Sequence, residues 1–91
     1  MESPSILFDR NITGLGNRIQ ELAPCKSFDG RRIIASDLED SEILIVRSVT
    51  KVDKDLLNNS KIKLVCSATA GLDHVDIEYL RKSGINFFST Q

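Results

Sequence analysis

The chain has 91 residues, which limits it to one domain that buries about 60 to 65% of the surface its unfolded form exposes. Its 12 basic and 13 acidic residues give a net charge of -1, so we expect neither a nucleic acid nor an anionic membrane as partner. No cationic segment leads into an apolar core near Met1, and no apolar run approaches the roughly 20 residues that span a bilayer. We therefore expect a cytoplasmic protein.

Five short apolar runs, separated by polar or helical segments, predict repeated β-α units on a mostly parallel sheet. The expected strands are residues 5–9, 25–28, 42–47, 63–68 and 86–90. The third and fourth runs are apolar at consecutive positions, so we expect central strands that are buried on both faces. For five such units we expect the strand order 2-1-3-4-5 and an α/β fold.

Apolar residues at helical spacing predict a helix over residues 12–22, which Pro24 ends. Ser36 is expected to cap a short turn that runs to Asp40.

Two further helices are expected in the second half of the chain. Asp53 is the predicted N-cap of a helix that carries the leucines at 56 and 57. Either Asp73 or Asp76 can cap the next helix, and Gly84 supplies its C-terminal stop.

The chain stops at Gln91, directly after the fifth expected strand, where a β-α fold would next need a helix to cover the sheet. We therefore expect an amino-terminal piece of a longer protein. Its exposed apolar sheet face should drive self-association or leave the fold only marginally stable.

The two cysteines do not indicate a metal site. Cys25 and Cys66 are far apart in the sequence and lack a C-x-x-C pair or the histidine partners that zinc requires. We interpret both as ordinary buried thiols and expect no metal ligand in the chain.

A ligand site is expected at the carboxyl ends of the strands, beside strands one and three, where the strand order reverses. Residues 9–11, Arg47, Ser48 and residues 69–71 fall within reach of this crevice. They supply a guanidinium, hydroxyls and free backbone N–H groups, which suit a small oxyanion such as a carboxylate or phosphate. Plainer interpretations stay open: an ion-paired arginine, a turn hydroxyl, and a tight turn that excludes large side chains.

Two other phosphate-binding patterns are excluded by the residues present. The Gly-Leu-Gly at 14–16 lacks the third glycine of a dinucleotide fingerprint, because Ile19 stands there, and we interpret it as a turn. A phosphate-accepting regulator would need an aspartate ending strand three and a lysine ending strand five. Arg47 and residues 90–91 stand at those ends.

Two segments carry a resemblance to a known family: "VRSVTKV" at 46–52 and "ATAGLDHVD" at 68–76. Together they resemble the amino-terminal region of the NAD-dependent D-isomer-specific 2-hydroxyacid dehydrogenases, in particular those that oxidise 4-phosphoerythronate. The match is good over residues 43–88 and looser before them. The resemblance implies a flavodoxin-like fold, and that residues 1–91 are the amino-terminal part of the substrate-binding domain of a two-domain dehydrogenase.

The resemblance also implies the substrate-binding residues. By motif position, Ser48 and Thr69 would hold a small phosphorylated hydroxyacid, with Arg47 and the amides of Ala70 and Gly71 as lesser contacts. The implied reaction is oxidation of the C2 alcohol of 4-phosphoerythronate to 2-oxo-3-hydroxy-4-phosphobutanoate, with hydride passing to NAD, in pyridoxal phosphate biosynthesis.

In this family, the NAD-binding Rossmann domain and the catalytic histidine, acid and arginine would follow Gln91. We therefore expect no catalytic residue, bound cofactor or activity in residues 1–91 alone, and a homodimer for the full enzyme. His74 is interpreted as a structural or helix-capping residue. A non-catalytic binding or interaction module that has kept the fold is the alternative.

Overall fold

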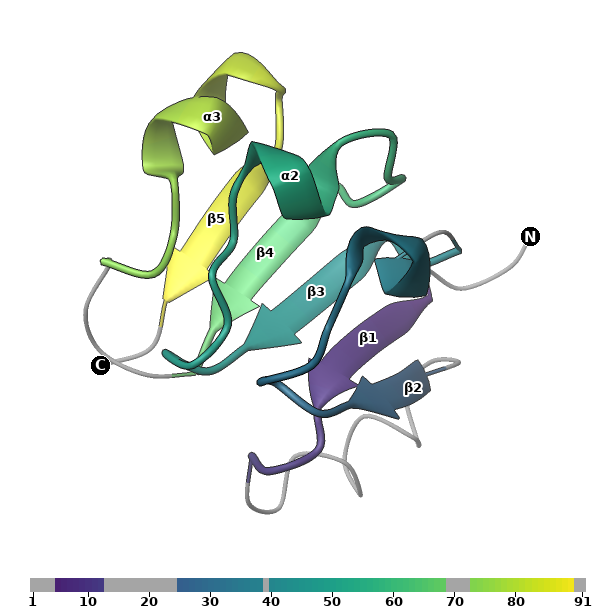
Figure 1. The fold of residues 1–91 in the computed structure, drawn as a ribbon. Helices are drawn as coiled ribbons and strands as arrows, with labels where there is room; N and C mark the ends of the chain where they lie inside the picture. The colour runs from purple at the N-terminus through teal and green to yellow at the C-terminus, as the bar shows by residue number, and fades with distance from the viewer. Residues whose placement is uncertain (1–4, 13–24, 39, 69–72, 90–91) are drawn as a thin grey trace.

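The computed structural model describes residues 5–12, 25–38, 40–68 and 73–89. Its centre is a five-stranded parallel sheet in the order β2-β1-β3-β4-β5 (Figure 1). The strands are β1 (Ile6–Asp9), β2 (Cys25–Phe28), β3 (Ile43–Val46), β4 (Leu64–Ser67) and β5 (Asn86–Ser89). The predicted α/β class, strand order and five strands are confirmed, each strand to within one residue.

The strands start in a common row. Ile6 pairs with both Cys25 and Ile43, Ile43 pairs with Leu64, and Leu64 pairs with Asn86. Because each strand has four residues, their carboxyl ends also form one row. Residues that directly follow different strands therefore lie along the same edge of the sheet.

One face of the sheet carries the main core. The 3-10 helix η1 (Ala35–Leu38) and the α-helices α2 (Lys54–Leu57) and α3 (Ile77–Lys82) all cover this face (Figure 1). Their buried leucines pack against the strand side chains that point the same way. Leu38, Leu44, Val46, Val65 and Leu80 are each at most 1% exposed. Because these helices are packed against the sheet, the loops that connect the strands to them are held in place as well.

The opposite face is less covered, which corrects the expectation that β3 and β4 are buried on both sides. Both strands are interior, but their burial alternates: Leu44 and Val65 are buried, whereas Ile45 and Cys66 are only half-buried. Phe88 of β5 is 61% exposed. The runs are apolar throughout, yet only one of their faces meets the helices of the main core.

Helix ends follow local hydrogen-bonding chemistry. Asp53 caps α2 by accepting from the backbone N–H of Leu56, as predicted. For α3 the structure selects Asp76, whose carboxylate accepts from the N–H of Tyr79 at 3.0 Å. Gly84 follows with φ of 74°, the left-handed conformation that ends a helix without steric cost in glycine.

The turn around η1 corrects one expectation. Ser36 was predicted as its cap, but it lies inside the helix and is exposed. The carboxylate of Asp37 instead accepts from the N–H of Ile34 at 2.9 Å. The predicted helix over residues 12–22 falls almost entirely outside the described residues.

None of the helices in the described ranges has the length and apolar character to cross a membrane.

Candidate functional site

The carboxyl edge of the sheet brings charged and hydroxyl side chains together, as the sequence predicted. Asp9 is the last residue of β1, and Arg47 and Ser48 directly follow β3, the neighbouring strand. Phe8 of β1 stands opposite Ile45 of β3, so Asp9 lies level with Val46, next to Arg47. A guanidinium and a hydroxyl therefore lie at the predicted edge of the sheet.

Asp9 and Arg47 form a short ion pair. The Arg47 Nε donates to Asp9 Oδ2 at 2.8 Å. The Asp9 side chain is completely buried, whereas the Arg47 side chain is 25% exposed. The other carboxylate oxygen, Oδ1, accepts from the backbone N–H of Asn11 at 2.9 Å. Both Asp9 oxygens are thus bonded, as a buried carboxylate requires.

Gly30, which follows β2, packs directly against this carboxylate. A Cβ at position 30 would overlap Asp9 Oδ2 and lie 2.9 Å from Cγ2 of Val49. Only a residue without a side chain fits this space. The Gly30 carbonyl also accepts from the hydroxyl of Thr50 at 2.8 Å, and Thr50 is 1% exposed.

Residues 47–50 form a turn that presents Ser48. Its ends are closed by the N–H of Thr50, which donates to the carbonyl of Arg47 at 3.2 Å. Ser48 lies inside this turn and is exposed, so its hydroxyl is accessible. The turn is tied to β1 through Arg47 and to the end of β2 through Thr50.

The end of β4 lies beside the same turn. The N–H of Ala68 donates to the carbonyl of Val46 at 2.9 Å, which extends the β3–β4 pairing to the sheet edge. The three other predicted contacts, Thr69, Ala70 and Gly71, lie outside the described residues. The structure therefore places Arg47 and Ser48 at the sheet edge, beside Ala68, which directly precedes Thr69 in the sequence.

His74 has structural partners. Its Nε2 lies 2.9 Å from the hydroxyl of buried Ser67, and its carbonyl accepts from the N–H of Val52 at 2.8 Å. Burial lowers the pKa of the His74 imidazole, with a smaller opposing effect from the Asp73 carboxylate. These contacts hold the two ends of the segment that contains Thr69, which fits the structural interpretation of His74.

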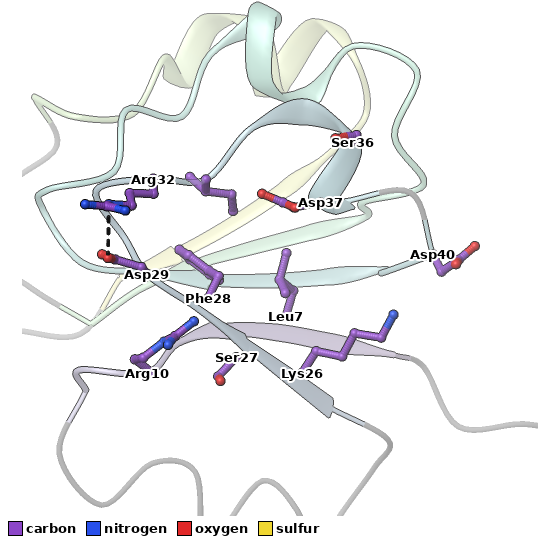
Figure 2. A pocket seen from close by; sticks show the side chains of 11 residues that line it. Leu7, Arg10, Lys26, Ser27, Phe28, Asp29, Arg32, Ser36, Asp37 and Asp40 are labelled. Atoms are coloured by element: carbon purple, nitrogen blue, oxygen red, sulfur yellow. Dashed lines mark ion pairs between the residues drawn. The ribbon is translucent and has the colours of Figure 1, made fainter.

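A hollow of about 630 Å³ lies elsewhere, between β2 and η1 (Figure 2). Its charged lining residues are Arg10, Lys26, Arg32, Asp29, Asp37 and Asp40. Figure 2 shows the 3.9 Å ion pair of Arg32 with Asp29 at one end and Asp40 at the other. Three positive and three negative side chains give this hollow no preference for an anion, and neither Arg47 nor Ser48 lines it. The sheet edge is therefore the better candidate for the site.

The thiols and carboxylates indicate no other chemistry. Burial raises the pKa of the Cys66 thiol, which disfavours the reactive thiolate. In the described ranges, no group of three or more His, Cys, Asp or Glu side chains is placed to hold a metal ion.

Sequence reasoning placed Asp9 near the crevice but assigned it no role, and it missed Gly30 and Thr50 altogether. The available signals were an aspartate ending an otherwise apolar strand and the Asp-Gly pair at 29–30, which is typical of a turn. The Asp9–Arg47 bond joins residues 38 positions apart and needs the strand order to be known first.

Comparison with known proteins identifies the family. The model of the D-isomer specific 2-hydroxyacid dehydrogenase family, catalytic domain, matches residues 12–91. The chain belongs to this family. The family predicted from residues 46–52 and 68–76 is thus confirmed, and its members are dehydrogenases.

Within the D-isomer specific 2-hydroxyacid dehydrogenases, the chain is similar to erythronate-4-phosphate dehydrogenases. The protein of that name from Enterobacter sp. (strain 638) is 45% identical over 82 residues, which is 90% of this chain and 22% of the relative. The one from Pseudomonas putida (strain GB-1) is 38% identical over 84 residues, 92% of this chain and 22% of the relative. The chain spans about a fifth of the length of these curated relatives.

Solved structures share the fold. An NAD+-bound 3-phosphoglycerate dehydrogenase from Entamoeba histolytica superposes with a TM-score of 0.82 at 22% identity, over 97% of this chain and 33% of that one. The D-lactate dehydrogenase from Aquifex aeolicus, complexed with NAD and lactic acid, gives 0.77 at 21% identity, over 94% and 27%. NAD is therefore bound by dehydrogenases with this fold.

Proposed function

We propose that residues 1–91 form the amino-terminal part of the substrate-binding domain of an NAD-dependent 4-phosphoerythronate dehydrogenase. The observation that carries the proposal is the position of Arg47 and Ser48 at the carboxyl edge of the sheet, where Arg47 pairs with the buried Asp9. It is supported by the similarity to erythronate-4-phosphate dehydrogenases over nine-tenths of the chain. Pyridoxal phosphate biosynthesis and a homodimeric full enzyme belong to the same proposal and rest on the resemblance alone. A cytoplasmic location also belongs to it and rests on the sequence pattern.

Binding and orientation are the roles assigned to this chain. Arg47 neutralises an oxyanion of the substrate, either the phosphate or the carboxylate, and Ser48 donates its hydroxyl to the same ligand. Thr69 and the amides of Ala70 and Gly71 are assigned contacts from the neighbouring strand end. A guanidinium that is already held in place loses little conformational entropy on binding, which favours affinity.

NAD does not fit the residues of this chain. A dinucleotide needs a G-x-G-x-x-G turn after a strand, and the 91 residues contain no such sequence. We therefore assign NAD binding, the catalytic groups and hydride transfer to the part of the relatives' length that these residues do not span. Residues 1–91 alone are expected to bind substrate without turning it over.

Calorimetric titration with 4-phospho-D-erythronate tests this proposal. D-erythronate, which lacks the phosphate, and inorganic phosphate serve as comparison ligands. Loss of a hydrogen bond to a charged group costs about 1.5 to 3 kcal/mol, so Arg47→Ala and Ser48→Ala should each weaken binding by about tenfold or more. Equal affinity in both variants and the parent would remove these residues from the site.

A second measurement addresses catalysis. The protein is mixed with 4-phospho-D-erythronate and NAD, and the absorbance of reduced NAD is followed. No signal is expected from residues 1–91, and clear turnover would contradict the proposal. Binding of unrelated protein segments with no affinity for the phosphorylated acid would instead favour a non-catalytic interaction module.

A further inference from the structure

The Asp9–Arg47 pair leaves most of the guanidinium unused. An arginine side chain carries five N–H donors, and the bonds formed by Arg47 within the described part of the chain use only Nε. The two terminal amino groups therefore keep four donors. The side chain is 25% exposed, so part of it faces solvent. These amino groups form the planar fork that pairs bidentately with phosphate or carboxylate.

Asp9 is well suited to fix the direction of this fork. Its side chain is fully buried, and one oxygen is held by the N–H of Asn11 while the other accepts from Arg47. Burial and the bond from Asn11 restrict movement of this carboxylate, so it offers Arg47 a fixed acceptor. The guanidinium is thus anchored at Nε, which leaves its two terminal amino groups available to a ligand.

Gly30 and Thr50 complete the support. Gly30 leaves no free space beside Asp9 Oδ2, and its carbonyl accepts from the Thr50 hydroxyl. Thr50 in turn closes the turn that begins at Arg47. The loops that follow β1, β2 and β3 therefore meet in one connected cluster, which holds the backbone and the side chain of Arg47 at the same time.

We propose that Asp9 is a positioning residue that fixes the Arg47 guanidinium for bidentate capture of an oxyanion, with Gly30 and Thr50 as its supports. This inference deepens the proposed function and rests on it for the identity of the ligand. Asp9 does not touch the substrate. It acts through Arg47, and its effect on binding depends on that residue.

A positioning role and a charge effect predict opposite changes in anion affinity when the Asp9 carboxylate is removed. Removing a carboxylate close to a bound anion should strengthen anion binding if the residue acts only through its charge. If Asp9 orients the guanidinium, its removal should weaken binding instead. Asp9→Asn is the sharpest variant, because an amide of equal size has one oxygen and can satisfy only one of the two donors, Asn11 or Arg47.

The test measures 4-phospho-D-erythronate affinity by calorimetry and the Arg47 Nε–H signal by NMR. Asp9→Asn should weaken binding by about 10- to 100-fold and remove the hydrogen-bonded Nε–H signal. Asp29→Asn, which removes the same charge from the end of the adjacent strand, should bind as the parent does or slightly tighter. Parent-like or tighter binding by Asp9→Asn would overturn the inference.

Two further variants test the role of the fork, and the first of them, Arg47→Lys, leaves Asp9 unchanged. Arg47→Lys keeps a positive partner for Asp9 but loses the fork, so it should bind as weakly as Asp9→Asn despite its unchanged charge. In an Arg47→Ala background, Asp9→Asn should change the affinity for the ligand by less than about twofold, because the guanidinium through which Asp9 acts is absent. Full affinity in Arg47→Lys, or a further loss in the double variant, would contradict positioning.

A titration with inorganic phosphate tests the positioning role of Asp9 independently of the proposed substrate. If the protein ignores 4-phosphoerythronate but phosphate shifts the terminal N–H signals of Arg47, and Asp9→Asn abolishes that shift, the substrate assignment fails and the positioning role stands. If neither ligand moves these signals, the positioning role is overturned as well.

Discussion

The hydroxyl of Ser67 lies 2.9 Å from Nε2 of His74, and this contact joins the end of β4 to the segment that leads into α3. The carbonyl of His74 is also held by the N–H of Val52, so both the side chain and the backbone of His74 are anchored. Thr69, a proposed substrate contact, belongs to the segment between the two partners. The Ser67–His74 pair therefore links the stability of this region to the protonation state of the His74 imidazole.

Acidification is expected to weaken the fold through His74. Burial lowers the pKa of the folded imidazole below its ordinary value of about 6.5, outweighing the opposing effect of Asp73. Just below pH 6.5 the unfolded chain therefore binds more protons than the folded one, so stability falls as pH drops through this window and is unaffected above it. The charged side chains of Lys51, Asp53, Asp73 and Asp76 line a small hollow together with His74.

Thermal unfolding at pH 7.5 and pH 5.5 checks this expectation. His74→Gln keeps a side-chain donor near Ser67 but cannot titrate, so its melting temperature should fall less than that of the parent between the two pH values. The carboxylates elsewhere contribute equally to both proteins and cancel in the comparison. An identical pH dependence in the parent and His74→Gln would rule out this histidine as the cause.

Gly30→Ala should be clearly destabilising. The added methyl group would overlap the buried Asp9 carboxylate and crowd Val49, and overpacking of this kind costs about 1 to 3 kcal/mol. Gly84→Ala is the matched control, because a Cβ there meets nothing within 4 Å and only the positive φ of 74° is strained. That strain costs about 1 to 2 kcal/mol.

Urea unfolding measures the free energy of unfolding of both variants. Titration with phosphate then distinguishes their effects on binding. Gly30→Ala should also weaken phosphate binding, since it displaces the carboxylate that holds Arg47, whereas Gly84→Ala should leave binding unchanged. Parent-like stability and binding in Gly30→Ala would show that the loop after β2 adjusts to the methyl group.

The strands were predictable because each is a short apolar run bounded by polar residues, and their order followed from repeated β-α units. The placement of Arg47 and Ser48 at one edge followed from that order. The Asp9–Arg47 bond was not predictable, because it depends on the side-chain directions of two residues 38 positions apart. The contact of Gly30 with Asp9 likewise depends on how closely two loops approach.

Local capping was predicted only in part, for a physical reason. A serine, threonine, aspartate or asparagine side chain can accept from any backbone N–H two or three residues away, so neighbouring candidates compete. Around η1 the side-chain bond to the backbone comes from Asp37, which accepts from the N–H of Ile34, and not from Ser36. Before α3, Asp73 and Asp76 were equivalent in the sequence, and the structure selects Asp76.

Asp76→Ala should therefore destabilise the protein, whereas Asp73→Ala should not. Loss of an N-cap side chain leaves the N–H of Tyr79 without its acceptor and typically costs about 1 kcal/mol. Asp73 is exposed and caps no described helix. Chemical unfolding of the two variants measures the difference, and equal stability would mean that water replaces the carboxylate at no cost.

The less covered sheet face should make the protein self-associate. Phe88 is 61% exposed there, beside half-buried Cys66, and β3 adds half-buried Ile43 and Ile45 to the same face. Contiguous apolar surface of this kind favours association because it removes that surface from water. Phe88→Asp should shift the protein toward monomer, since a charged side chain in the contact would have to be desolvated.

Ile34 provides a matched control for this prediction. It is also 61% exposed, but it precedes η1 and lies outside this sheet face. Ile34→Asp should therefore leave the oligomeric state unchanged. Light scattering over a concentration series measures both variants against the parent. A parent that stays monomeric at all concentrations, or an equal effect of the two substitutions, would show that this face does not drive association.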